Sequence, residues 1–212
     1  MLKQIRIHGR GGQGVVTFAE LIALAAYYDG KKVQAFPSFG VERRGAPVES
    51  YIRISDKEIF RRDHITNPDY LIIVDPTLLN NGDILNGLDK SDFFLINSKK
   101  NEDEIKRSFA IYPDIKIKSI DAVELALQIL GKPIINTAML GAFSCLTKLI
   151  SMKGVKRAIE EKFNYKGKNI VAKNLELAQK AHDHFDPHKQ FVVVPGEQDL
   201  MIISSDKMIV DS

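Results

Sequence analysis

Short apolar runs alternate with longer helix-like stretches over the first two thirds of the chain, which predicts strands separated by helices. The continuous apolar runs at 70–74 and 93–97 are typical of strands that are buried on both faces of a sheet. The stretch 15–28 is apolar nearly all round, so it predicts a helix that is buried on more than one side. Weaker patterns predict strands at 4–8, 32–36 and 115–120 and helices at 78–88, 102–109 and 122–130.

The segment 48–54 alternates between apolar residues on one side and Glu49, Tyr51 and Arg53 on the other. This alternation predicts a strand that has one face exposed to solvent. The turn-forming residues 55–57 then lead into 58–61, which predicts a β-hairpin. A hairpin adds an antiparallel pair, so we expect a mixed sheet in which most strands are parallel.

The last third of the chain changes character. Three helical segments at 136–150, 153–163 and 169–185 follow one another without a strand between them, and short β-like runs follow after Pro187. These runs predict a terminal flap or an arm that reaches a partner. We therefore divide the chain into a domain at 1–185 and a β-like tail at 186–212. The predicted fold is a three-layer α/β/α sandwich with a mixed, mostly parallel sheet, a Rossmann-like start and a helical C-terminal part.

Composition narrows the classes of function. The chain of 212 residues is 44% hydrophobic, which is enough for a packed core. Its 30 basic and 27 acidic residues leave a net charge of +3, whereas a nucleic-acid-binding protein usually has a denser basic face. The single cysteine excludes a disulfide framework and an iron–sulfur cluster held by this chain alone. No apolar run approaches a membrane span of about 18 residues and the N-terminus lacks an apolar signal core, so we expect a cytoplasmic protein.

The sequence His-Gly-Arg-Gly-Gly-Gln-Gly at 8–14 links the first predicted strand to the first predicted helix. Its glycines allow sharp turns and close approach of the backbone, and the start of the helix directs free N–H groups at the loop. This combination predicts a site for an anion, usually a phosphate, with help from the Arg10 side chain. The candidate binding residues are Gly9, Arg10, Gly11, Gly12, Gln13 and Gly14.

Other interpretations of this glycine loop stay open. A Rossmann-type dinucleotide site requires an acidic residue at the end of the second strand, about 20 residues on, to hold the ribose. That strand ends in Phe36 and Pro37, and Asp29 comes before it, so the sequence counts against NAD. The loop can also contact a partner protein, or it can be a tight turn that binds nothing.

A second unusual segment, 37–47, is too rich in glycine and proline for a helix or a central strand and too apolar for an idle surface loop. It contains Arg43 and Arg44, two adjacent arginines that cannot both point into a core. Arginines in a rigid loop suit phosphate or carboxylate groups. The alternatives are an ion pair with Glu42 or Glu49, or a contact with another subunit.

Two further groups of reactive side chains are interpreted as structural. His182, His184 and His188 are close in sequence, but helical positions two apart face different ways, so we expect a solvated helix end rather than a metal site. Cys145 lies among apolar residues and is expected to be a buried small hydrophobic side chain rather than a nucleophile. No Ser–His–Asp order, carboxylate pair or Walker loop is visible in the sequence. We therefore expect no complete catalytic set in this chain.

The glycine loop, followed by Val-Val-Thr and a long Ala/Leu helix, resembles the gamma subunit of 2-oxoacid:ferredoxin oxidoreductases. The same resemblance is carried by Gln-Ala-Phe-Pro-Ser-Phe-Gly-Val-Glu-Arg-Arg-Gly-Ala-Pro-Val at 34–48 and by Asn-Thr-Ala-Met-Leu-Gly-Ala at 136–142. It extends to about residue 185. Within the family the chain looks most like the pyruvate (pyruvate synthase) type, and the 2-ketoisovalerate type stays open.

This resemblance implies a complex that oxidatively decarboxylates a 2-oxoacid with coenzyme A and yields acyl-CoA, CO2 and reduced ferredoxin. It implies alpha, beta and delta subunits as partners, with thiamine diphosphate, Mg and 4Fe-4S clusters held on those subunits. The gamma subunit is then expected to pack against them and to help form the coenzyme A site, where the glycine loop and Arg43 or Arg44 suit the phosphates. The alternative is a free-standing NAD- or FAD-binding protein that uses the glycine loop. Neither interpretation involves nucleic acid or a membrane.

Overall fold

The computed structural model describes residues 1–38, 45–80, 82–88, 93–109, 111 and 114–189. Within these ranges, one sheet contains six strands: β1 (Lys3–Arg10), β2 (Lys32–Ser38), β3 (Pro47–Ser55), β4 (Tyr70–Ile73), β5 (Phe93–Asn97) and β6 (Lys116–Ile120). Their spatial order is β2-β3-β1-β4-β5-β6. The strands β1, β4, β5 and β6 are parallel, and β3 lies antiparallel between β1 and β2. The expected mixed, mostly parallel sheet is confirmed.

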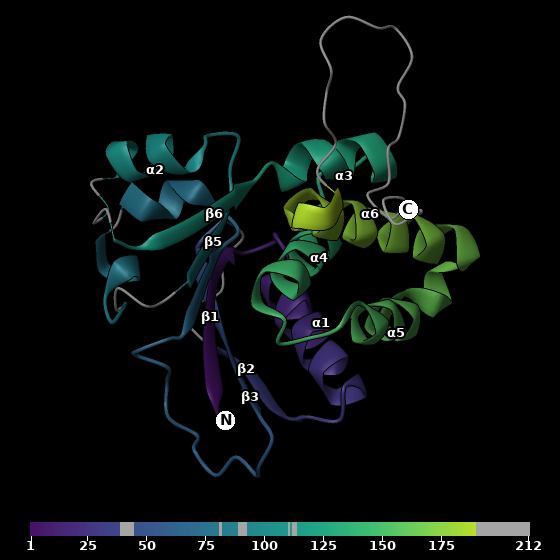
Figure 1. The fold of residues 1–212 in the computed structure, drawn as a ribbon, viewed down its shortest axis with the longest axis horizontal. Coiled ribbons are helices and arrows are strands. Elements are labelled where there is room, and N and C mark those ends of the chain that lie inside the picture. The colour runs from purple at the N-terminus through teal and green to yellow at the C-terminus, as the bar shows by residue number, and fades with distance from the viewer. Residues whose placement is uncertain (39–44, 81, 89–92, 110, 112–113, 190–212) are drawn as a thin grey trace, which may run out of the picture.

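Helices cover both faces of this sheet, as Figure 1 shows. One face carries a layer of longer helices, and the other carries a short helix together with two 3₁₀ turns. The predicted three-layer α/β/α architecture is therefore confirmed. The first layer contains α1 (Val15–Tyr28), α3 (Ala122–Leu130), α4 (Asn136–Thr147), α5 (Met152–Phe163) and α6 (Lys168–Phe185), and the second contains α2 (Glu102–Ser108) with η1 (Pro76–Asn80) and η2 (Gly82–Leu85).

The helix α1 is apolar nearly all round because it is enclosed on opposite sides. It packs against β2 and β3 of the sheet and against α4 and α5 of the helical layer. Phe18, Leu21 and Ile22 are fully buried in the larger of the two hydrophobic clusters. The predicted bounds of α1 are confirmed, since the helix begins directly after Gly14, whose φ of 75° only a glycine adopts easily.

The helical layer depends on close approach between backbones. A Cβ atom on Gly141 of α4 would lie 1.9 Å from the carbonyl oxygen of Ala178 in α6, and a Cβ on Gly154 of α5 would lie 2.5 Å from that of Ala25 in α1. Glycine is therefore required at both crossings, because any side chain would force the helices apart. This packing fixes the position of α4, whose N-terminal residue Asn136 lies against Gly14 of the glycine loop.

The prediction of a half-exposed strand at 48–54 is wrong. Arg53 is completely buried, and Tyr51 is only 5% exposed. The polar face of β3 is covered, because the irregular segment 56–69 lies over it and Arg53 donates hydrogen bonds to Gln34 and to the carbonyl of Asp63. The predicted hairpin into 58–61 is also wrong, since β3 pairs with β2 and β1 instead.

Other element boundaries also differ from the sequence prediction. The helix expected at 78–88 consists of the two 3₁₀ turns η1 and η2. The strand β2 continues through Pro37 to Ser38, because an edge strand tolerates a residue without a backbone N–H. The predicted β-like tail lies outside the described residues from 190 onward. Among the described helices, none is both long enough and apolar enough to cross a membrane.

Candidate functional site

The carboxyl end of β1 is the point at which the strand order of the sheet reverses, because β2 and β3 lie on one side of β1 and β4, β5 and β6 lie on the other. β1 leads through α1 to β2 on one side, and β4 lies next to β1 on the other side. Ligands of open α/β sheets bind outside the carboxyl ends of the strands at such a switch point. The glycine loop follows β1 at this edge, and Asp75 follows β4 beside it.

The backbone of the glycine loop leaves several N–H groups unpaired. Gly12 and Gly14 have φ angles of 93° and 75°, and a Cβ on Gly9 would lie 2.5 Å from Cγ2 of Val15. Within the described part of the chain, no acceptor pairs with the N–H groups of Gly12, Gly14 and residues 15–17. A row of free N–H groups at the positive end of a helix is the arrangement that binds phosphate groups.

The side chain of Arg10 braces the loop. Its Nε lies 3.1 Å from Oδ2 of Asp75, and its two terminal nitrogens donate to Thr77 Oγ1 at 2.8 Å and to the carbonyl of Gly45 at 3.1 Å. Arg10 therefore joins three loops at the carboxyl edge of the sheet. The expected contact between Arg10 and an anion stays a prediction, and the structure assigns the guanidinium this bracing role.

Gln13 and Asp75 complete the brace. The side-chain oxygen of Gln13 accepts from the backbone N–H of Arg10 at 2.7 Å, and its Nε2 donates to Asp75 at 2.9 Å. Burial alone would raise the pKa of Asp75, but hydrogen bonds from Thr77 and Gln13 and the charge of Arg10 together hold this pKa below its ordinary value. Asp75 is therefore a charged anchor at neutral pH.

The C-terminal end of the segment 37–47 contacts the glycine loop. The N–H of Gly11 donates to the carbonyl of Ala46 at 2.8 Å, and the N–H of Gly45 donates to the carbonyl of Gly11 at 3.0 Å. Two segments that the sequence marks as unusual are thus joined backbone to backbone. Arg43 and Arg44 themselves lie outside the described residues, and they directly precede this junction.

Sequence reasoning missed a polar cluster on the sheet beneath the loop. His8 is 4% exposed, its Nδ1 lies 3.5 Å from Oε1 of Glu49, and its Nε2 has no hydrogen-bond partner among the described residues. Burial is the main cause that lowers the pKa of His8 to about 4, and the nearby Arg6 adds to this effect against the opposing charge of Glu49. His8 is therefore neutral at pH 7.

The cluster extends outward from Glu49. The hydroxyl of Tyr51 donates to Glu49 at 2.5 Å and lies 3.3 Å from Nδ1 of His64. Burial and this bond to Glu49 raise the pKa of Tyr51 to about 12. The signal available in the sequence is the alternation in β1 and β3, whose polar positions lie opposite one another only once the antiparallel register is known.

Comparison with known proteins establishes the family. Residues 4–184 match the model of the pyruvate ferredoxin/flavodoxin oxidoreductase family. The chain belongs to this family. It is 48% identical over 180 residues to the pyruvate synthase subunit PorC of Methanocaldococcus jannaschii, and the aligned region covers 85% of this chain and 95% of that protein.

A solved structure agrees with this assignment to the pyruvate ferredoxin/flavodoxin oxidoreductase family, and a second one shares the fold. The pyruvate oxidoreductase subunit PORC of Thermotoga maritima matches with a TM-score of 0.76 and 32% identity, over 86% of this chain and 96% of that one. The 2-oxoglutarate:ferredoxin oxidoreductase of Magnetococcus marinus, solved with coenzyme A bound, matches with a TM-score of 0.72 and 23% identity. That match covers 87% of this chain but 31% of the longer one, and it shows a common fold.

The topology of this family member also argues against a Rossmann-type dinucleotide site. In the Rossmann order the second strand lies directly beside the first, so an acid at its end reaches the ribose. In this sheet β3 separates β1 from β2, and β2 ends in Ser38. The comparisons give no support to a free-standing dinucleotide-binding protein.

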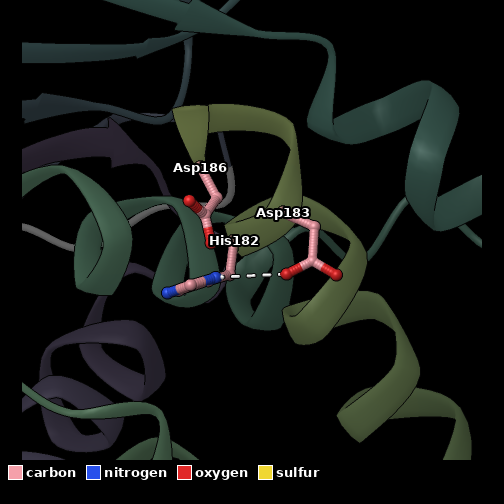
Figure 2. A group of neighbouring side chains, drawn as sticks. All are labelled: His182, Asp183 and Asp186. Atoms are coloured by element: carbon pink, nitrogen blue, oxygen red, sulfur yellow. Dashed lines mark hydrogen bonds and ion pairs between the residues drawn. The ribbon is translucent and has the colours of Figure 1, made fainter. Parts of the chain in front are cut away.

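The histidines near the C-terminus do not gather into one cluster. Among the described residues, the candidate metal-binding group is His182 with Asp183 and Asp186, whose ligand atoms lie within 4.8 Å of one another (Figure 2). Both carboxylate oxygens of Asp183 are already bonded to Nζ of Lys189, at 3.1 and 3.2 Å. Nearby Cys145 is buried as expected, and burial raises the pKa of its thiol. A thiol in this state is a packing residue rather than a nucleophile.

Proposed function

We propose that this chain is the gamma subunit of a 2-oxoacid:ferredoxin oxidoreductase complex in which its glycine loop contributes to the coenzyme A site. The relatives named pyruvate synthase and pyruvate oxidoreductase subunits support pyruvate as the 2-oxoacid. The complex would convert pyruvate and coenzyme A to acetyl-CoA and CO2 and pass two electrons to ferredoxin.

The observation that carries the coenzyme A proposal is the row of unpaired N–H groups at 12 and 14–17. Coenzyme A carries a diphosphate and a 3′-phosphate, and both need donors or cations. The loop supplies donors, and Arg43 and Arg44 precede the junction at Gly45 that is bonded to Gly11. Bidentate guanidinium–phosphate contacts are among the stronger hydrogen bonds in proteins.

The remaining chemistry is assigned to partner chains. A 4Fe-4S cluster needs four thiolates, and this chain has one cysteine, which is buried. Thiamine diphosphate with its Mg and the iron–sulfur clusters would therefore be held by alpha, beta and delta subunits, and these cofactors would supply the decarboxylation and electron transfer. The residues of this chain would bind and orient coenzyme A for acyl transfer.

Steady-state kinetics of reconstituted complexes tests the proposal. Complexes that contain Arg43→Ala or Arg44→Ala are compared with wild type while coenzyme A and the 2-oxoacid are varied in turn. Loss of one charged hydrogen-bonded contact of about 1.5–3 kcal/mol predicts a KM for coenzyme A that is raised about tenfold to a hundredfold. The KM for the 2-oxoacid should stay the same, because that substrate binds at the thiamine on other subunits.

Arg107→Ala is the matched control, since Arg107 is an exposed arginine on α2 and its loss changes the net charge equally. If both loop variants assemble normally and keep the wild-type dependence on coenzyme A, then the two arginines serve an interface or an internal ion pair. That result would remove Arg43 and Arg44 from the proposed coenzyme A site.

A further inference from the structure

Two helix N-termini meet beside the glycine loop. Gly14 is the N-cap residue directly before α1, and Asn136 is the first residue of α4. The side-chain nitrogen Nδ2 of Asn136 lies 2.5 Å from the position that a Cβ on Gly14 would take, so the two helix starts are in contact. Neither start has a side-chain cap, and neither has an acidic residue in its first turn.

The backbone N–H groups at the start of α4 are buried without acceptors among the described residues. Asn136 is 6% exposed and Thr137 is 1% exposed. Within the described part of the chain, no acceptor pairs with the N–H groups of residues 136–138, and Oδ1 of Asn136 also has no partner. A buried helix end of this kind normally finds a capping side chain or another partner. The helices α2, α3 and α5 each have one, from Asn101, Asp121 and Ser151.

This contact brings together two positive ends that repel each other. Each helix N-terminus carries about half a positive charge, and an anion placed between two such ends stabilises both. The carboxylate of Asp75 at the same edge of the sheet does not fill this role, because it is bonded to Arg10, Gln13 and Thr77. The positive charge at the paired N-termini of α1 and α4 therefore matches an oxyanion that comes from outside the chain.

We propose that the N-termini of α1 and α4, together with the side-chain NH2 group of Asn136, form one site for a phosphate oxyanion. The glycine loop supplies donors from Gly12 and Gly14, and the first turn of α4 supplies donors from the opposite side. This inference rests on the proposed function, in which the oxyanion belongs to the diphosphate of coenzyme A. The same chemistry fits free phosphate or pyrophosphate, so both sources are probed below.

Asn136→Asp is the decisive variant. It keeps the shape of the side chain and places a carboxylate where the site expects an external anion. The ligand-free variant should be at least as stable to heat as wild type, because a buried carboxylate is favoured only where the surroundings are positive. Pyrophosphate should raise the Tm of wild type relative to potassium chloride of equal ionic strength, and it should leave the Tm of Asn136→Asp unchanged.

In the reconstituted complex, Asn136→Asp should raise the KM for coenzyme A by about tenfold or more through like-charge repulsion. Asn169→Asp is the matched control, since Asn169 is an exposed residue in the first turn of α6. This control adds the same charge at a helix start, and its KM for coenzyme A should stay within about twofold of wild type.

Each contrary outcome is informative. An Asn136→Asp chain that melts well below wild type or fails to fold would show that the place is not positive and would overturn the site. Unchanged coenzyme A kinetics in this variant, together with a wild-type Tm that does not respond to pyrophosphate, would also overturn the site, while an effect of Arg43→Ala would leave the proposed function standing. A wild-type Tm that responds to pyrophosphate in a complex whose Asn136→Asp variant keeps its coenzyme A kinetics would reassign the oxyanion to free phosphate and overturn the diphosphate assignment.

Discussion

The Nε atom of Arg10, at the end of β1, lies 3.1 Å from Oδ2 of Asp75, a residue 65 positions later in the chain that follows the parallel neighbour β4. The same carboxylate oxygen accepts from Nε2 of Gln13 at 2.9 Å. This pair fixes the glycine loop on the segment that follows β4. The loop is therefore held by side-chain bonds between Arg10 and Gln13 on one side and Asp75 and Thr77 on the other. The backbone N–H groups of Gly12 and Gly14 have no acceptor among the described residues. A turn that merely connects a strand to a helix does not require such a brace.

Asp75→Asn tests the brace. The amide keeps the shape of the side chain but loses the charge that pairs with Arg10, and its NH2 group meets donors from Gln13 or Thr77. We expect the free energy of unfolding to fall by about 1–3 kcal/mol and the KM for coenzyme A to rise, because the loop loses its fixed geometry. Denaturant unfolding and complex kinetics measure the two effects. Asp103→Asn, on the exposed start of α2, is the control, and equal behaviour of the two variants would mean that the brace has no role.

Gly12→Ala and Gly30→Ala form a matched pair of backbone variants. Both glycines have positive φ angles, 93° and 78°, and an added Cβ on Gly30 meets nothing within 4 Å. Each substitution should cost about 1–2 kcal/mol of stability through backbone strain. Gly12→Ala alone should raise the KM for coenzyme A, since its methyl group and its shifted backbone disturb the phosphate-binding N–H groups. Equal kinetic effects from both variants would indicate that the loop acts only through stability.

His8 predicts a specific dependence of stability on pH. Its pKa falls from 6.5 to about 4 on folding, mainly because of burial, so the folded protein binds fewer protons than the unfolded chain between these values. Stability is therefore unaffected by His8 above pH 6.5, and it falls by up to about 3 kcal/mol as the pH drops toward 4. Urea unfolding at several pH values measures this slope.

His8→Asn should flatten that slope, while His188→Asn, at an exposed position, should leave it as in wild type. Carboxylates also take up protons in acid, so the difference between the two variants isolates the histidine. A wild-type slope in His8→Asn would show that the buried ring takes up its proton without penalty.

Much of the fold could be predicted because the pattern and the environment agree. The bounds of α1 and β5 match the sequence prediction, since each has an uninterrupted apolar pattern and a strong stop signal. The Asp121 cap of α3 was equally predictable, because its side chain accepts from the N–H of Glu124 as a capping aspartate does. These features depend on neighbours within a few residues.

The failures depend on distant partners. Arg53 looks exposed in the sequence, but Gln4, Gln34 and Asp63 satisfy it inside the protein. The glycine loop could be recognised as a candidate site from its residues, whereas the roles of Asp75 and Asn136 follow only from which strand lies beside β1 and where α4 begins. No local pattern carries that information, because it arises from strand order and helix packing.

Hydrogen exchange of the assembled complex tests the central claim most directly. The N–H groups of Gly12, Gly14 and residues 15–17 lack acceptors in the described structure, so they should exchange rapidly when coenzyme A is absent. Saturating coenzyme A should slow exchange in a peptide that spans 10–18 and leave the α2 peptide 102–108 unchanged. Unchanged exchange at 10–18, in a complex that is saturated with coenzyme A and turning over, would contradict the claim that this loop holds its phosphates.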